Sequence, residues 1–259
     1  MSMPDVLLLF DIDGTLTDSA GLTRVALDKA ALHLFGIERG TQGITSYGLT
    51  DPLIFRKIVE NNQLKFPNWE YTFSKFCNIY VAYLDQLLNQ SSSVKTHPGI
   101  KELLSAIAKL PFFFLALGTG NIRASAMVKL KRHGIDGYFP VGGFGDDSED
   151  RAEIIKVAYH RACEHYRKNF DPEWTWVIGD TPYDIFAGKA WGFRTMAVAT
   201  GFYTVEELSE YSPTIIFPHL EDVNLVIKTF TSPLKELKDM AIVKKGRIAE
   251  SRRNRSDDL

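Results

Sequence analysis

The most constraining feature of the chain is an apolar run at positions 6–10 that ends abruptly in two aspartates, Asp11 and Asp13. The run has the length and composition of a short buried strand, and the Gly-Thr pair that follows is typical of a turn. Residues two apart in an extended chain point to the same side, so both carboxylates should emerge together where the strand ends. Such a pair is costly unless a cation neutralises it. The segment therefore suggests a metal-assisted reaction with a carboxylate nucleophile.

An Asp-x-Asp-Gly segment has two simpler explanations, a calcium-binding loop and a solvated turn. The calcium-binding loop needs a glutamate at its twelfth position, where this chain has Leu22. The common phosphate-binding pattern G-x-x-x-x-G-K-[ST] does not occur in the chain. A solvated turn stays open on this segment alone, so the interpretation depends on partner motifs downstream.

Two further apolar runs end in polar turns of the same kind. The run at 112–117 leads into a Gly-Thr-Gly-Asn turn that contains Thr119, and the run at 174–178 leads into a turn with Asp180 and Asp184. A helical pattern follows each turn. In an open parallel sheet, ligands collect at the carboxyl ends of the strands, so we expect the three turns to converge on one site.

This ordered set of motifs resembles the haloacid dehalogenase-like superfamily of phosphohydrolases. Its D-x-D-G-T signature corresponds to residues 11–15, its second-motif threonine to Thr119, and its G-D-x-x-x-D motif to Gly179, Asp180 and Asp184. The match covers most of residues 5–218. Within the superfamily, the long helical segment between the first two motifs is similar to that of the phosphoglycolate phosphatase and β-phosphoglucomutase branch.

The third motif of that superfamily is where this sequence departs. The family supplies a lysine near the start of a helix after the third strand, where its charge balances the nucleophile and the phosphate. Here residues 145–153 are largely acidic, with no lysine before Lys156 but with Arg151 at the expected helix start. Because a guanidinium binds carboxylate or phosphate in bidentate fashion, we take Arg151 as the candidate and expect Lys156 to face solvent. An ordinary surface arginine among acidic neighbours is the alternative.

The resemblance also implies a chemistry. Asp11 would attack phosphorus to give an aspartyl-phosphate, and Asp13 would protonate the leaving oxygen and then activate water. A Mg²⁺ ion would be held by Asp11, Asp180 and the backbone carbonyl of Asp13, with Asp184 holding metal-bound water or the ligand geometry. The second aspartate of the first motif favours phosphoryl transfer over dehalogenation, in which no alkoxide leaving group needs an acid.

The resemblance assigns catalytic contacts with the phosphoryl oxygens to Thr119 and Arg151, and further substrate contacts to Gly120 and Asn121. The expected reaction is hydrolysis of a small phosphorylated metabolite, since water is the default acceptor. Phosphomutases share Asp13, so a phosphomutase of the β-phosphoglucomutase type stays open. A catalytically silent phosphate- or metal-binding regulator is the non-enzymatic alternative, and the unusual third motif would be its sign.

The alternation of helical and strand patterns predicts an α/β fold, a Rossmann-like parallel sheet with helices on both faces, plus a small all-helical cap inserted after the first strand. The expected catalytic core is 1–18 and 93–231, the helical cap is 19–92, and a basic extension follows at 232–259. Helices are expected at 22–35, 52–60 and 69–88, and later strands at 112–117, 138–144, 174–178 and 193–198.

The cap would exclude bulk water and add substrate contacts. Residues 47–51 resemble the specificity loop of this branch. Arg24, on the first cap helix, is a possible contact for an anionic substrate, although a solvent-facing helix charge is the interpretation that we favour.

Composition restricts the partners. The formal net charge of −2 gives no reason to expect nucleic acid. No apolar run approaches a membrane span, and the N-terminal run is too short for a signal peptide. The two cysteines are far apart and lack metal-ligand spacing, which fits a reducing, cytoplasmic location. The sequence leaves the oligomeric state open, and the extension at 232–259 is expected to be a solvated helix with a frayed tail.

Overall fold

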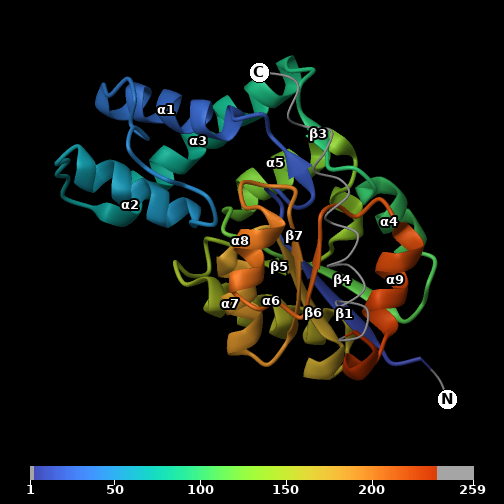
Figure 1. Ribbon diagram of the computed structural model, residues 1–259. Coiled ribbons are helices and arrows are strands. Elements are labelled where there is room, and N and C mark those ends of the chain that lie inside the picture. Colours follow the sequence, from blue (N-terminus) through green and yellow to red (C-terminus); the bar gives the residue numbers. More distant parts are fainter. Residues whose placement is uncertain (1–2, 238–259) are drawn as a thin grey trace.

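The computed structural model describes residues 3–237 and shows a six-stranded parallel sheet with helices on both faces (Figure 1). The strands lie in the order β5-β4-β1-β6-β7-β8, so the first strand of the chain is at an inner position. Their bounds are Val6–Phe10 (β1), Phe113–Gly118 (β4), Gly142–Gly143 (β5), Thr175–Gly179 (β6), Arg194–Val198 (β7) and Ile215–Phe217 (β8). This architecture confirms the predicted α/β, Rossmann-like class.

Strand β1 is buried along its whole length, and its side chains alternate between two cores. Leu8 and Phe10 belong to the core on one face, whereas Leu7 and Leu9 belong to the core on the other. Burial on both faces is what a continuous apolar run in a parallel sheet indicates. The helices of the sheet domain are α4 (Ile100–Ile107), α5 (Arg123–His133), α6 (Arg151–Tyr166), α7 (Pro182–Ala190), α8 (Val205–Glu210) and α9 (Val223–Thr231).

Between β2 (Thr17–Asp18) and β3 (Lys95–Thr96) the chain forms three helices that lie to one side of the sheet, α1 (Leu22–Phe35), α2 (Asp51–Asn61) and α3 (Trp69–Gln90) (Figure 1). They bury an apolar core of their own, in which the rings of Phe55 and Phe76 lie 4.8 Å apart. A two-stranded antiparallel pair, β2 (Thr17–Asp18) and β3 (Lys95–Thr96), links this helical unit to the sheet. We propose that the helical unit acts as the cap.

The expected strand at 138–144 is wrong for most of its length. Residues Asp136–Tyr138 form a 3₁₀ helix, and only Gly142–Gly143 pairs with β4. Phe139 turns into the core instead, with its ring 5.9 Å from that of Phe10. A Cβ at Gly143 would lie 2.1 Å from the carbonyl oxygen of Ile154, so the close packing of α6 requires glycine there. The apolar residues of this segment therefore reflect burial rather than pairing.

Two further sequence expectations concern membrane spans and the basic extension at 232–259. Among the described residues, no helix is long and apolar enough to cross a membrane. The predicted basic extension lies outside the described residues from position 238 onward. Its described part includes Leu237, which is buried in the core of the sheet domain.

Candidate active site

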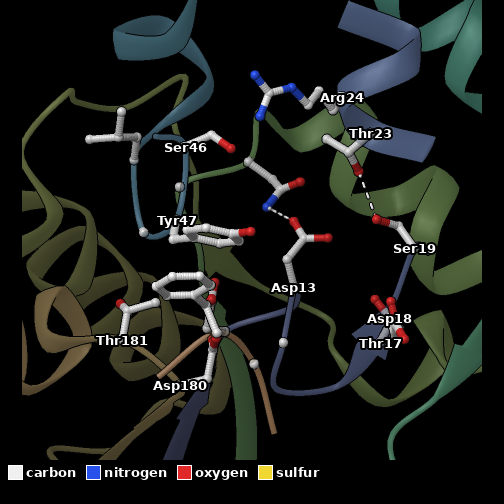
Figure 2. A pocket seen from close by; sticks show the side chains of 18 of the residues that line it. Asp13, Thr17, Asp18, Ser19, Thr23, Arg24, Ser46, Tyr47, Asp180 and Thr181 are labelled. Carbon is white, nitrogen blue, oxygen red and sulfur yellow. Dashed lines mark hydrogen bonds between the residues drawn. The ribbon is translucent and has the colours of Figure 1, made fainter. Parts of the chain in front are cut away.

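The turns after β1, β4 and β6 meet at one edge of the sheet, as the sequence predicts, and a cavity of about 470 Å³ opens there. The sheet domain contributes Asp11 and Asp13 to its lining, and the helical unit contributes Arg24 and Tyr47 (Figure 2). The ring of Tyr47 stacks on Phe202, which follows β7, with centroids 4.1 Å apart. The cavity is therefore enclosed by both parts of the molecule.

Asp11 lies directly after β1, where its backbone N–H donates to the carbonyl oxygen of Ile178 at 2.9 Å. Its side chain is buried but lines the cavity. Burial raises the pKa of Asp11 to about 6, and the guanidinium of Arg151, 2.8 Å from Oδ1, opposes that rise. The carboxylate is thus shielded from bulk water, paired with a cation and accessible from the cavity, which suits a nucleophile.

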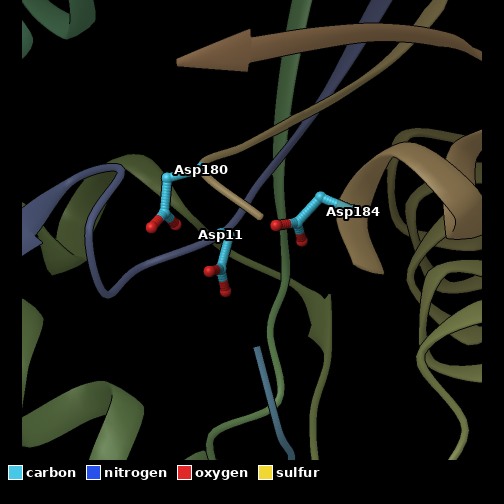
Figure 3. Close-up of side chains that lie close together, drawn as sticks. All are labelled: Asp11, Asp180 and Asp184. Atoms are coloured by element: carbon cyan, nitrogen blue, oxygen red, sulfur yellow. The ribbon is translucent and has the colours of Figure 1, made fainter. Parts of the chain in front are cut away.

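Three buried carboxylates, Asp11, Asp180 and Asp184, each offer an oxygen within 4.8 Å of the others (Figure 3). Burial and the two neighbouring carboxylates hold the pKa of Asp180 well above its ordinary value. Asp11 Oδ1 forms an ion pair with Arg151 at 2.8 Å, but it accepts no hydrogen bond of good geometry from the described residues. Three carboxylates against one guanidinium leave excess negative charge, and this oxygen-rich donor set fits a hard divalent cation such as Mg²⁺.

Glycines make room for the carboxylate of Asp180. A Cβ at Gly14 would lie 2.2 Å from Asp180 Oδ2, and one at Gly201 would lie 1.8 Å from the same oxygen. Gly14 also has a φ of 77°, which disfavours other residues. Thr15 donates to Asp180 Oδ1 at 3.2 Å. The Gly-Thr pair of the first motif therefore orients Asp180 toward Asp11.

Asp184 is held by protein groups on both oxygens. Its Oδ1 accepts from Arg151 at 2.6 Å, and its Oδ2 accepts from the backbone N–H and the hydroxyl of Thr181 at 3.1 and 2.7 Å. These contacts use much of its acceptor capacity. The arrangement supports an indirect role for Asp184, in which it orients Arg151 and metal-bound water.

Arg151 begins α6, where Asp150 caps the helix by accepting from the N–H of Ala152 at 2.8 Å. The Arg151 side chain is only 7 % exposed and contacts Asp11 and Asp184. Burial lowers the pKa of Arg151, but these two carboxylates raise it by more, so the guanidinium stays charged. The structure thus brings Arg151 to the expected place of the third-motif cation. It leaves Lys156 at the surface, paired with Glu153 at 3.3 Å.

The turn after β4 contacts the second aspartate of the first motif. The side-chain amide of Asn121 donates to Asp13 Oδ2 at 2.8 Å and to Thr119 Oγ1 at 3.0 Å. Gly120 and Asn121 line the cavity, whereas Thr119 lies fully buried. A Cβ at Gly120 would lie 3.1 Å from a guanidinium nitrogen of Arg151. The four residues predicted to hold the phosphoryl group therefore do gather beside the aspartates.

The expectation that Arg24 is a solvent-exposed helix charge is confirmed in part. The side chain is exposed, but it lines the cavity together with Asp13 (Figure 2). Its guanidinium donates to the hydroxyl and the carbonyl oxygen of Thr41 at 3.1 and 2.7 Å, and Thr41 is held in turn by Asp28. Arg24 is thus fixed at the cavity wall, and it pairs with no carboxylate of residues 3–237.

Two buried charged residues near the site, Asp51 and Lys129, were not among the predicted site residues, and Asp51 entered the sequence analysis only as the end of segment 47–51. Asp51 begins α2 and accepts from the N–H of Ile122 and the hydroxyl of Ser125, both at 2.8 Å. Burial raises its pKa to about 6, and Lys129 opposes that rise. The available signal for Lys129 was its position on the apolar face of its helix, beside Leu130.

The fold and the site define a class of α/β proteins in which a cluster of carboxylates lies at the carboxyl end of a Rossmann-like sheet. A family model described as haloacid dehalogenase-like hydrolase matches residues 8–198, and the chain belongs to this family. The predicted family is confirmed, and curated relatives bear the name phosphoglycolate phosphatase, as the resemblance indicates. A putative β-phosphoglucomutase from Thermotoga maritima shares the fold, with a TM-score of 0.58 at 21 % identity. The protein is accordingly an enzyme, a hydrolase of this family.

Similar proteins extend over most of the chain. A phosphoglycolate phosphatase of Vibrio vulnificus (strain YJ016) is 26 % identical over 230 residues, which cover 85 % of this chain and 96 % of that protein. A phosphoglycolate phosphatase of Aquifex aeolicus (strain VF5) is 29 % identical over 202 residues, covering 75 % and 85 %. The crystal structure of CbbY from Rhodobacter sphaeroides in complex with phosphate has a TM-score of 0.65 at 20 % identity, covering 85 % and 96 %. This structural likeness shows the shared fold.

Mg²⁺ should stabilise the protein more at pH 7.5 than at pH 5. Burial raises the pKa of Asp11 from 3.8 to about 6. Ionisation of Asp11 therefore lowers the free energy of unfolding of the metal-free protein as pH rises through 6. Ionisation of Asp180 acts in the same direction. A Mg²⁺ ion at these carboxylates would compete with protons, so its shift in melting temperature should grow across this range.

Thermal unfolding with and without Mg²⁺ measures this difference. Asp180→Asn should lose most of the shift at pH 7.5, whereas Asp136→Asn, outside the cluster, should keep it. A Mg²⁺ shift that is equal at both pH values, or that survives in Asp180→Asn, would rule out this metal site.

Proposed function

We propose that the protein is a Mg²⁺-dependent phosphatase that hydrolyses a small phosphate monoester through an aspartyl-phosphate on Asp11. The observation that carries this proposal is the buried pairing of Asp11 with Arg151, beside Asp13, at the wall of one cavity. Curated relatives that bear phosphatase names favour hydrolysis over the phosphomutase reaction. The presence of every expected acidic residue argues against a silent regulator.

In the first half of the reaction, an oxygen of Asp11 bonds to phosphorus as the bond to the leaving oxygen breaks, and Asp13 gives that oxygen a proton. In the second half, a water oxygen bonds to phosphorus, the bond to Asp11 breaks, and Asp13 takes the proton of the water. Arg151 stabilises the phosphoryl oxygens while paired with Asp11. A Mg²⁺ ion held by Asp11, Asp180 and the backbone carbonyl of Asp13, with Asp184 beside them, would neutralise charge on the phosphoryl oxygens.

The several charged groups of the site are needed because the hydrolysis of phosphate monoesters requires a very large rate acceleration. Hydrolysis of phosphate monoesters can require accelerations of up to ~10²¹. General acid–base catalysis contributes only about 10²–10⁴ of this. Electrostatic stabilisation at the cavity must supply much of the remainder, and the stacked Tyr47 and Phe202 line one wall of that cavity.

A substrate panel tests the proposal directly. Purified protein should hydrolyse p-nitrophenyl phosphate and at least one member of a panel of phosphoglycolate, sugar phosphates and nucleotides, and chelation of Mg²⁺ should stop the reaction. Activity absent from the whole panel, despite Mg²⁺ binding in the thermal assay, would favour the regulator. Conversion of a sugar 1-phosphate to the 6-phosphate without release of phosphate would favour the phosphomutase.

Arg24→Met should impair substrates with a second anionic group, such as phosphoglycolate. The guanidinium lines the cavity and has no ion pair among the described residues, so it is available to a substrate carboxylate. A hydrogen bond to a charged group contributes about 1.5–3 kcal/mol, and the exposure of Arg24 puts the expected rise in KM at the low end, about tenfold. KM for p-nitrophenyl phosphate should change little. Lys29→Met, on the same helix but away from the cavity, is the control, and equal effects on both substrates would exclude this role.

A further inference from the structure

Lys129 is a buried cation that the proposed reaction does not yet use. It lies in α5 with only 2 % of its side chain exposed, and it does not line the cavity. Its Nζ lies 2.5 Å from Asp13 Oδ2 and 2.5 Å from Asn121 Oδ1. A buried lysine is costly unless it is paired, so a specific pairing is needed to explain its position.

The three side chains form a closed set of contacts. Lys129 donates to Asp13 and to the amide oxygen of Asn121, while the amide nitrogen of Asn121 donates to Asp13 Oδ2 at 2.8 Å. That nitrogen also donates to Thr119, which is fully buried. The position of Asp13 is therefore tied to α5 and to the end of β4.

The contacts fall on one oxygen of Asp13 and spare the other. Oδ2 accepts from both Lys129 and Asn121, whereas Oδ1 has no hydrogen-bond partner among the residues that the structure describes. Two donors on one oxygen fix the rotation of a carboxylate. Oδ1 is itself buried, whereas 39 % of the Asp13 side chain is exposed and the residue lines the cavity.

We propose that Lys129 is a positioning residue that, with Asn121, holds the carboxyl group of Asp13 at the cavity for its proton transfer in both halves of the reaction. The inference rests on the proposed phosphatase function. In the first half the proton leaves Asp13 for the leaving oxygen as the phosphorus bond to that oxygen breaks. In the second half it returns from the attacking water as the bond between phosphorus and Asp11 breaks. Lys129 itself touches neither substrate nor water.

A leaving-group comparison separates this role from a structural one. The ratio kcat/KM covers events through departure of the leaving group, and 2,4-dinitrophenolate needs no proton to leave. Lys129→Met should therefore lower kcat/KM about 10²-fold for the alkyl phosphate that the wild type hydrolyses best, the scale of general acid catalysis. It should leave kcat/KM for 2,4-dinitrophenyl phosphate close to wild type. Lys131→Met, exposed on the same helix, should match the wild type on both substrates.

Three further variants complete the test. Lys129→Arg should recover part of the alkyl phosphate activity, and Lys129→Gln provides a second neutral variant if Lys129→Met unfolds at assay temperature. In an Asp13→Asn background, adding Lys129→Met should cause no further loss, because both changes remove the same function.

The outcomes distinguish the two proposals. Equal losses on the alkyl and dinitrophenyl substrates, or additive losses in the double variant, would overturn the positioning role and leave Lys129 with a structural one. A wild-type protein that hydrolyses neither substrate would instead overturn the phosphatase function. Wild-type turnover with a loss confined to the alkyl phosphate supports both.

Discussion

Asp11→Asn should abolish phosphatase turnover, with a loss of roughly 10⁴-fold or more, as for other residues on which covalent catalysis depends. An amide oxygen is too weak a nucleophile to attack phosphorus at a useful rate. The shape of the side chain is kept, so the contacts around it should persist. Removing one negative charge also relieves the repulsion from Asp180 and Asp184, which each offer an oxygen within 4.8 Å of one of Asp11. The variant should therefore be at least as stable as the wild type in the absence of metal.

Initial rates on p-nitrophenyl phosphate and thermal unfolding of the same sample measure these two effects. Asp5→Asn is a matched control, because Asp5 precedes the same strand but pairs with Lys168 at the surface. It should leave both activity and stability near wild type. Wild-type turnover by purified Asp11→Asn would overturn the proposed nucleophile and the mechanism built on it.

The fold was largely accessible from the sequence because its strongest signals are local. The apolar run of β1, the capping of α2 by Thr50 with Pro52 in its first turn, and the turns after β4 and β6 each need only a few neighbouring residues to be recognised. The sheet then brings the turns after β1, β4 and β6 together. A short strand such as β8, with three residues, lacks enough repeats to show a period, and the sequence analysis missed it.

The residues of the candidate site that were missed depend on contacts between distant elements. Lys129 reads as an ordinary helix lysine until α5 is packed against the turn that holds Asp13. Asp51 reads as a helix-capping residue until α2 meets Ile122 on the sheet domain. In each case the burial comes from tertiary packing, which a local pattern does not encode. Arg151 could be proposed only because the resemblance indicated where a cation belongs.

Arg151→Met should cause the second large loss, through both stability and catalysis. The guanidinium is the buried cation that pairs with Asp11 and Asp184, and its removal leaves these carboxylates without that compensation. Breaking a buried pair in this way costs about 3–5 kcal/mol. Since the pKa of Asp11 is already raised by burial, the loss of Arg151 should raise it further. The penalty should therefore be largest at neutral pH and shrink as pH falls and the carboxylates take up protons.

The catalytic loss should exceed what partial unfolding explains. Arg151 is placed to stabilise the phosphoryl oxygens, and removing one such donor costs about 10²–10³-fold in kcat. Arg151→Lys should recover part of kcat because it keeps the charge. The recovery should be partial because lysine lacks the planar guanidinium that contacts both Asp11 and Asp184. Lys156→Met, one to two turns further along α6 at the surface, should have little effect. Kinetics at a temperature where each variant is folded make the comparison. If Lys156→Met were the more damaging change, the assignment of the third-motif cation would pass from Arg151 to Lys156, and the ion pair with Asp11 would be structural.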